Sequence, residues 1–153
     1  MPKTASAMLA ATCAAVTLCA PAPALATAVE QATVREINAA RAAHDLGRVR
    51  ADDGLAEAAD DQSRWMAAND VLGHRAGLED RLGAAVPGAD LWGETVAWMP
   101  GSRSTLARRT VHAWLRSPAH RAILLMPDMR AAGVGEATGD DGVFVTADFA
   151  GAS

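Results

Sequence analysis

WLRSPAHR, residues 114–121, contains the end of one helix and the start of the next. Pro118 disfavours helical backbone in the residue before it, so the first of these helices ends near Ser117. Ser117 is also a favourable N-cap residue and Pro118 suits the first helical position, which predicts a short helix from Pro118 to about Leu125. His120 then lies in the opening turn of that helix, among free backbone N–H groups.

The residues before this stretch predict the helix that ends there. Pro100-Gly101 marks a turn, and Ser102 or Ser104 can cap a helix with Leu106 and Trp114 on its core face. After the stretch, two extended runs span residues 131–138 and 142–149. The GDDG sequence between these runs is typical of a hairpin connection, so the chain is expected to end in two antiparallel strands.

The N-terminal half predicts two further helices and a long loop. Residues 28–44 contain neither glycine nor proline and carry apolar residues at helical spacing. A second helix follows Asp52 or Asp53, with an apolar stripe from Leu55 to Met66. Residues 77–93 contain four glycines and little periodicity, which indicates a loop with at most a short helix.

The first 26 residues have the features of a secretory signal peptide. Lys3 supplies the positive charge, residues 7–20 are apolar, and Ala24-Leu25-Ala26 offers a cleavage site. The apolar run is too short for a comfortable membrane span. We therefore expect a signal peptide at 1–26, an extracytoplasmic location, and one domain at 27–153 with no transmembrane segment after cleavage.

Cysteine content and charge limit the partners of this domain. Both cysteines, Cys13 and Cys19, lie in the leader, so the mature chain is expected to hold its fold by packing alone. The formal net charge of −4 becomes about −5 without Lys3. Nucleic acid and anionic membranes do not attract an acidic domain, so no nucleic-acid partner is expected. We also expect a monomer.

Three polar residues are candidates for a functional site: His74, Glu94 and His120. Each is expected where a loop meets a regular element, which is the usual place for functional side chains on a rigid scaffold. His112 stands two residues before Trp114 and is expected to point into solvent. A lone histidine is more often a surface or packing residue than a ligand, so sequence position by itself defines no chemistry.

Several motifs occur in a characteristic order along the chain. They are NxxR at 38–41, LGH at 72–74, GETVA at 93–97, WLRSPAHR at 114–121 and GVG at 133–135. With this set of motifs the chain resembles the CAP superfamily, the SCP domain of cysteine-rich secretory proteins, antigen 5 and plant pathogenesis-related proteins. The resemblance covers nearly all of residues 27–153, and the short bacterial members are the most similar.

The resemblance implies an α+β fold, a three-layer α-β-α sandwich with a small, largely antiparallel sheet. It also implies a cleft that contains His74, Glu94 and His120. The family's second glutamate falls at Ser117 in this chain, and Thr95 replaces the asparagine that usually follows Glu94. The resemblance therefore supplies at most three metal ligands.

The chemistry of this set leaves three arrangements open. Two imidazoles and the Glu94 carboxylate could hold zinc with one open position for water. Glu94 could instead accept a hydrogen bond from an imidazole N–H, which leaves His74 and His120 as the only protein ligands of the metal. Without a metal, a carboxylate beside two histidines could make the site respond to external pH.

The function that we expect is a secreted ligand-binding or interaction module. Its partner would be a small ligand, a lipid or a component of the cell envelope. The first alternative is a metal-assisted hydrolase of peptide or cell-envelope material, with Glu94 as general base. The others are a sterol- or lipid-binding module, and a polar network that serves only to tie the loops to the sheet.

Overall fold

The computed structural model describes residues 27–152, and the expected signal peptide at 1–26 lies outside them. The helices are α1 (Ala28–Ala42), α2 (Asp53–Asn69), α3 (Leu78–Ala85), α4 (Leu106–Arg116) and α5 (Pro118–Leu124), with a 3-10 turn, η1, at Arg103–Thr105. The strands are β1 (Arg50–Ala51), β2 (Leu91–Met99), β3 (Met129–Thr138) and β4 (Val143–Gly151).

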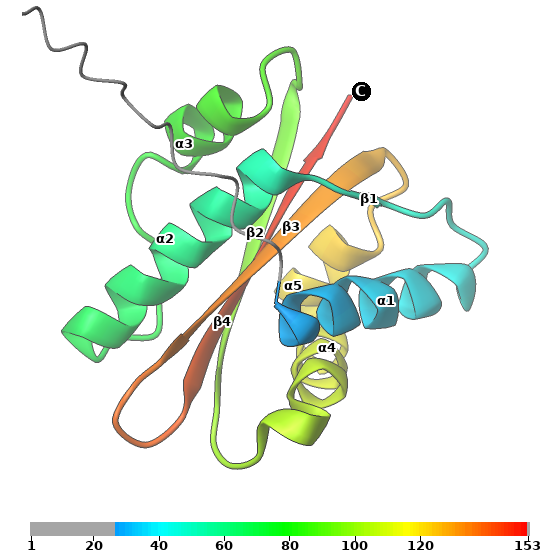
Figure 1. The fold of residues 1–153 in the computed structure, drawn as a ribbon. Helices are drawn as coiled ribbons and strands as arrows, with labels where there is room; N and C mark the ends of the chain where they lie inside the picture. The colour runs from blue at the N-terminus through cyan, green and yellow to red at the C-terminus, as the bar shows by residue number, and fades with distance from the viewer. Residues whose placement is uncertain (1–26, 153) are drawn as a thin grey trace, which may run out of the picture.

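The strands form one sheet in the order β1-β3-β4-β2. The short β1 pairs with β3 in parallel, while the β3–β4 and β4–β2 pairs are antiparallel. Helices α2 and α3 cover one face of the sheet, and α1, α4 and α5 cover the other (Figure 1). This arrangement confirms the predicted three-layer α-β-α sandwich with a largely antiparallel sheet.

Helix α2 lies directly on the sheet because β3 has no side chains beneath it at two positions. A Cβ atom on Gly133 would stand 2.0 Å from the backbone nitrogen of Ala56, and one on Gly135 would stand 2.1 Å from that of Asp60. Both distances are far below any real contact. The GVG motif of the sequence is therefore the surface on which α2 packs.

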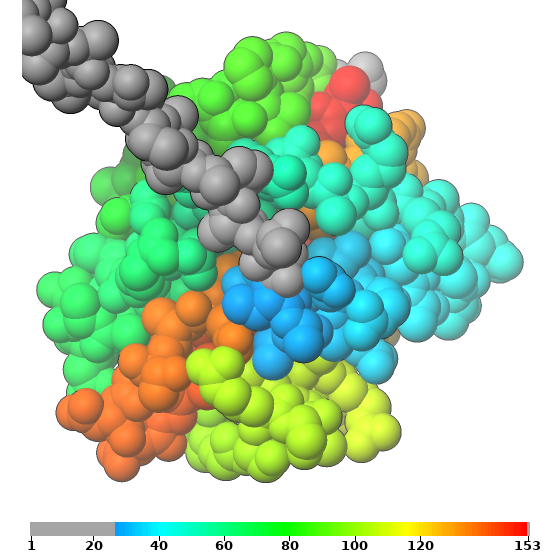
Figure 2. Space-filling model, in the orientation of Figure 1, coloured from blue at the N-terminus to red at the C-terminus, as the bar shows by residue number. Residues whose placement is uncertain are grey.

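The main core fills the opposite face of the sheet. Trp114 from α4, Ile37 from α1 and Phe149 from β4 are fully buried there. The indole nitrogen of Trp114 donates to the carbonyl of Val96 at 2.9 Å, which fixes α4 against strand β2. In the space-filling view the helices enclose the sheet, and the hairpin end of β3 and β4 emerges between α2 and α4 (Figure 2).

Arg41 joins α1 to the connection between α5 and β3. Its fully buried guanidinium donates to the backbone carbonyls of Gly47 at 2.7 Å, Leu124 at 2.8 Å, Met126 at 2.9 Å and Met129 at 3.3 Å. Burial lowers the pKa of Arg41, and the positive charge of Arg130 lowers it further. Four carbonyl groups of two separate segments thus depend on one side chain.

The sequence prediction missed two strands, the two-residue β1 and the nine-residue β2. The predicted loop at 77–93 contains α3, in agreement with a short helix, but its last three residues belong to β2. The strand places Trp92, Glu94 and Val96 on one face and Thr95 and Ala97 on the other. Helices cover both faces, so no alternation of polar and apolar residues marks the strand in the sequence.

The predicted helix starts need two corrections. Ser102 caps η1, accepting a hydrogen bond from the backbone nitrogen of Ser104 at 3.3 Å, and α4 begins only at Leu106. Ser117 occupies the N-cap position of α5 as predicted, but its side chain makes no capping hydrogen bond. Pro118 at the first helical position instead fixes the backbone that starts α5.

No helix within residues 27–152 is both long enough and apolar enough to cross a membrane.

Candidate functional site

Glu94 lies in the edge strand β2 and its side chain is fully buried. Its cross-strand partner is Asp148, which in turn lies opposite Gly133, so both carboxyl groups face the α2–α3 layer. Oε1 of Glu94 accepts a hydrogen bond from Nδ1 of His74 at 2.7 Å, and Oε2 accepts one from Nη2 of Arg81 at 2.8 Å. Both carboxylate oxygens are thus paired with side chains of that layer.

His74 lies in the loop between α2 and α3. The buried Gln62 of α2 holds this loop by donating to the carbonyl of Gly73 at 2.7 Å. Because the Glu94 carboxylate can only accept, Nδ1 of His74 carries a proton in this hydrogen bond, and Nε2 is the ring nitrogen that Glu94 leaves free. The side chain is 49% exposed, so the ring is fixed by the protein and open to solvent.

His120 comes from the opposite helical layer, in the first turn of α5. Helix α5 packs on β2, where Ile123 lies against the face of the strand at Gly93. His120 is half-buried, and its pKa is lowered first by that burial and then by an electrostatic interaction with His74. The two histidines therefore lie close enough to influence each other across the edge strand.

Most of the chain matches one known protein family. A family profile described as "CAP: Cysteine-rich secretory protein family" matches residues 34–149, a range that includes His74, Glu94 and His120. The chain belongs to this family. No curated protein sequence matches it.

Several solved structures have the same fold. An extracellular protein containing an SCP domain from Bacillus anthracis superposes with a TM-score of 0.65 and 28% identity, over 80% of this chain and 40% of its own length. For an outer surface protein from Borrelia burgdorferi the TM-score is 0.69 and the identity 22%, over 80% of this chain and 92% of its own. NaASP2, solved with Zn²⁺, has a TM-score of 0.62 and 11% identity, and 80% of each chain is covered.

At two positions this chain lacks the residue that the resemblance to the family leads us to expect. Thr95 is buried and donates from its hydroxyl to the carbonyl of Ala147 at 3.4 Å, so it serves the strand pairing of β2 with β4. Ser117, in place of the second glutamate, lies between α4 and α5. Neither residue adds a carboxylate to the site.

Sequence reasoning missed two residues that contact or adjoin Glu94. Arg81 in α3 pairs with its carboxylate, and Asp148 in β4 lies beside it. Asp148 is completely buried, and neither of its oxygens has a hydrogen-bond partner with good geometry within residues 27–152. The pKa of Asp148 is raised to about 8, first by burial and then by the charge of Glu94.

Only the strand register could have located Asp148, since it stands 54 positions after Glu94 in the sequence and directly opposite it in the sheet. Arg81 carries no motif that distinguishes it from other surface arginines. The sequence therefore predicts the two histidines and Glu94 of the expected cleft. It does not predict Arg81 and Asp148, which lie beside Glu94.

The side chains of His74, Glu94 and His120 do not form a metal site with three ligands. Within residues 27–152 no three His, Cys, Asp or Glu side chains are grouped so that they could hold a metal ion. Glu94 is paired with Arg81 and with Nδ1 of His74, which corresponds to the arrangement in which the carboxylate orients an imidazole. Nε2 of His74 and the ring of His120 are the groups that remain for a metal.

Proposed function

We propose that this protein is a secreted ligand-binding module whose ligand binds at His74 and His120 above the buried Glu94. One observation carries the proposal: the Arg81–Glu94–His74 chain of hydrogen bonds, at 2.8 and 2.7 Å, fixes an imidazole that is half exposed. A surface histidine that binds nothing does not need a buried ion pair to orient its ring. A ring fixed at Nδ1 with Nε2 free is suited to bind a ligand.

The same geometry supports binding more than hydrolysis. A general base needs a carboxylate oxygen that can reach a water molecule or a substrate proton. Glu94 has a fully buried side chain, and both of its oxygens accept hydrogen bonds from neighbouring residues. Ser117 supplies no second carboxylate. The hydrolase alternative with Glu94 as base is therefore the weaker one.

The lipid alternative also has little support from the described residues. A largely apolar hollow of about 210 Å³ lies between α1, the start of α2 and β3. Binding sites for small molecules typically enclose ~300 to 1,000 Å³. The hollow is thus smaller than the groove that a sterol or another lipid needs.

Two relatives support the extracytoplasmic location. The Bacillus protein is extracellular and the Borrelia protein is an outer surface protein. The sequence of the first 26 residues, with its positive start, apolar run and Ala-x-Ala site, supports the same location. We therefore propose that the domain acts outside the cytoplasmic membrane.

Zinc is the ligand that tests the site most directly. The structure of NaASP2 with Zn²⁺ belongs to a relative at 11% identity, so the fit rests on the two histidines of this chain. Zinc is usually held by three or four protein ligands, and a two-histidine site is expected to bind it weakly. The lowered pKa of His120 favours the unprotonated imidazole that a metal requires, and Glu94 leaves Nε2 of His74 free for the metal.

The first prediction concerns zinc binding. Excess zinc should raise the melting temperature of the protein near pH 7, because a ligand that binds only the folded state stabilises it. His74→Ala and His120→Ala should each abolish the rise. His112→Ala is the matched control, since His112 lies exposed on α4, and it should keep the full effect.

Thermal unfolding with and without zinc, and with a chelator added afterwards, measures these shifts. An unchanged melting temperature in the wild-type protein would rule out zinc as the ligand. A rise that survives both substitutions would place the metal elsewhere.

A further inference from the structure

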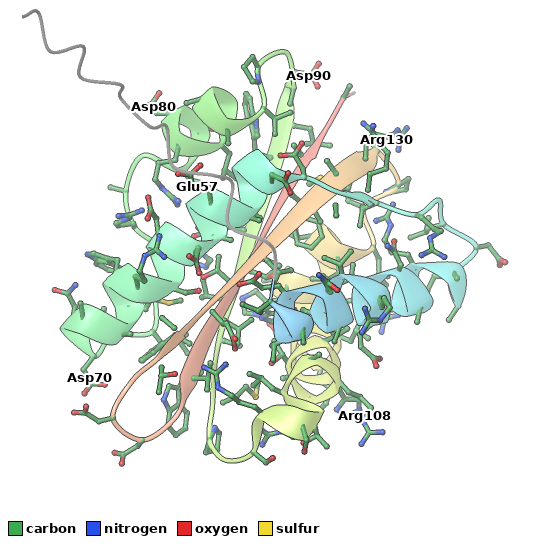
Figure 3. All side chains as sticks on the ribbon, viewed as in Figure 1. Glu57, Asp70, Asp80, Asp90, Arg108 and Arg130 are labelled. Atoms are coloured by element: carbon green, nitrogen blue, oxygen red, sulfur yellow. The ribbon has the colours of Figure 1, made fainter. Side chains whose placement is uncertain are left out.

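A second pocket lies between α2 and α3. Its volume is about 410 Å³, within the range of ~300 to 1,000 Å³ that small-molecule sites occupy. Charged residues of both signs line it: Glu57 and Asp61 from α2, and Arg75 and Arg81 from the loop before α3 and from α3 itself. Figure 3 labels Glu57 in the space between the two helices.

The arginines and the acids of this pocket do not pair with one another. Arg75 has no hydrogen bond or ion pair to any residue within 27–152. Glu57 is exposed and likewise has no such partner among these residues, whereas Asp61 pairs with Arg64 at 2.6 Å. Opposite charges that share a pocket without contact are free to bind a ligand that carries both charges.

Arg75 and Arg81 also have N–H groups that donate no hydrogen bond within residues 27–152. Arg81 uses Nη2 for Glu94, while its Nε and Nη1 are buried without an acceptor, as is Nε of Arg75. A buried donor without a partner is unfavourable, so a group that brought acceptors to these arginines would bind favourably. A carboxylate is a small group whose two oxygens match the planar guanidinium.

Asp148 does not cancel the positive charge of this side of the pocket. It lies close enough for both Arg75 and Arg81 to act on it electrostatically, and its pKa is nevertheless raised to about 8 by burial. At neutral pH it is therefore mostly protonated, and Glu94 is the one carboxylate that pairs with Arg81. The guanidinium of Arg75 is thus left without an ion-pair partner within residues 27–152.

We propose that the α2–α3 pocket binds a small zwitterion of the amino-acid type, with its carboxylate on Arg75 and Arg81 and its ammonium group at Glu57. This inference goes beyond the ligand site at His74 and His120, since Arg81 is the only residue that the two sites share. The proposal does not depend on zinc binding.

The test is a titration of the purified protein with L-alanine, followed by NMR shifts of backbone amides. Acetate and methylammonium are the probes that carry one charge each, and both should bind at least about tenfold more weakly than alanine, the loss expected for one charged hydrogen-bonded contact. The amide shifts should centre on α3 and on the α2 residues that face it.

Two variants and one control assign the contacts. Arg75→Gln should weaken alanine binding by about tenfold or more, and Glu57→Gln should reduce the affinity for alanine to that for acetate. Arg108→Gln should bind like the wild-type protein, because Arg108 lies exposed on α4, away from this pocket (Figure 3).

Either of two results would overturn the proposal. The first is acetate that binds as tightly as alanine, which would leave no role for the acidic side of the pocket. The second is an Arg75→Gln protein that folds and binds alanine as well as the Arg108→Gln control. Amide spectra of each variant recorded without ligand show that the fold is intact.

Discussion

Glu94 illustrates how a single buried carboxylate determines the geometry of a site. A charged group in a protein interior is tolerated when it is paired and hydrogen-bonded, because water no longer solvates it. His74 and Arg81 meet that requirement, and Arg81 alone supplies a permanent charge. The orientation of the His74 ring is therefore a consequence of satisfying a buried carboxylate.

Arg41 is the residue whose loss should destabilise the fold most clearly. Arg41→Met would leave the carbonyl groups of Gly47, Leu124, Met126 and Met129 without their donor in a buried position. Unsatisfied buried groups cost about 1–3 kcal/mol each and their effects do not add fully, so we expect a loss of about 3 kcal/mol or more in the free energy of unfolding.

Urea denaturation measures this loss. Arg48→Met is the matched control, because Arg48 is exposed a few residues further on, and its effect should stay within about 0.5 kcal/mol. A similar stability for the Arg41 and Arg48 variants would mean that the four carbonyl groups find other donors.

At the scale of elements, the sequence predicts a helix or strand well where one face of it is buried and the other is exposed to solvent. Helices α2 and α4 have such faces, and residues such as Leu55 and Trp114 mark them at helical spacing. The β3–β4 hairpin was recognisable from its turn residues. Strand β2 was not, because helices cover both of its faces and its side chains show no alternation.

In the candidate site, too, some residues could be recognised from the sequence and others could not. His74, Glu94 and His120 stand in short motifs that the resemblance to the CAP superfamily made recognisable. Arg81 and Asp148 reach Glu94 through tertiary packing and strand register, which no local pattern in the sequence encodes. The ion pair of Glu94 with Arg81, and the position of Asp148 beside Glu94, could therefore be identified only from the three-dimensional structure.

The contact between α2 and β3 gives a prediction at the scale of elements. Gly133→Ala places a methyl group 2.0 Å from the backbone nitrogen of Ala56, so α2 has to move away from the sheet. Overpacking of this kind typically costs about 1–3 kcal/mol, and backbone cannot yield as a side chain does, so we expect the upper end of that range.

Thermal unfolding of Gly133→Ala and Gly47→Ala measures this effect. At Gly47 no atom lies within 4 Å of the place that a methyl group would take, and its φ angle is not positive, so Ala should be tolerated there. Equal melting temperatures for the two variants would contradict the close packing of α2 on β3.

At the scale of the whole molecule, the site lies where all three layers meet at one edge of the sheet. His74 and Arg81 come from the α2–α3 layer, Glu94 from the edge strand, and His120 from α5 on the other face. Any change in the separation of the layers therefore changes the distance between the two histidines. Two carboxyl groups, Glu94 and Asp148, are buried at this same place, which couples the protonation of the site to the stability of the fold.

The last prediction concerns that coupling. The pKa of Asp148 is about 8 in the folded protein, against an ordinary value of 3.8. Between these values the folded state retains a proton that the unfolded chain has released, so the free energy of unfolding should fall as the pH rises from about 4 to about 8. The slope has an upper limit of about 1.4 kcal/mol per pH unit, and below about pH 4 the group has no effect.

Asp148→Asn should remove this dependence, because asparagine keeps the shape of the protonated acid and does not titrate. The wild-type protein should lose stability relative to the variant as the pH is raised, whereas Asp140→Asn, in the exposed hairpin turn, should follow the wild type. His120 acts in the opposite sense, since its lowered pKa removes stability as the pH falls below about 6.5, and this contribution is common to all three proteins.

Urea denaturation across this pH range gives the difference in the free energy of unfolding between wild type and Asp148→Asn. If that difference is the same at every pH, the proton is not held by Asp148 or by the pair that it forms with Glu94, because a shared proton would be lost with either carboxyl group.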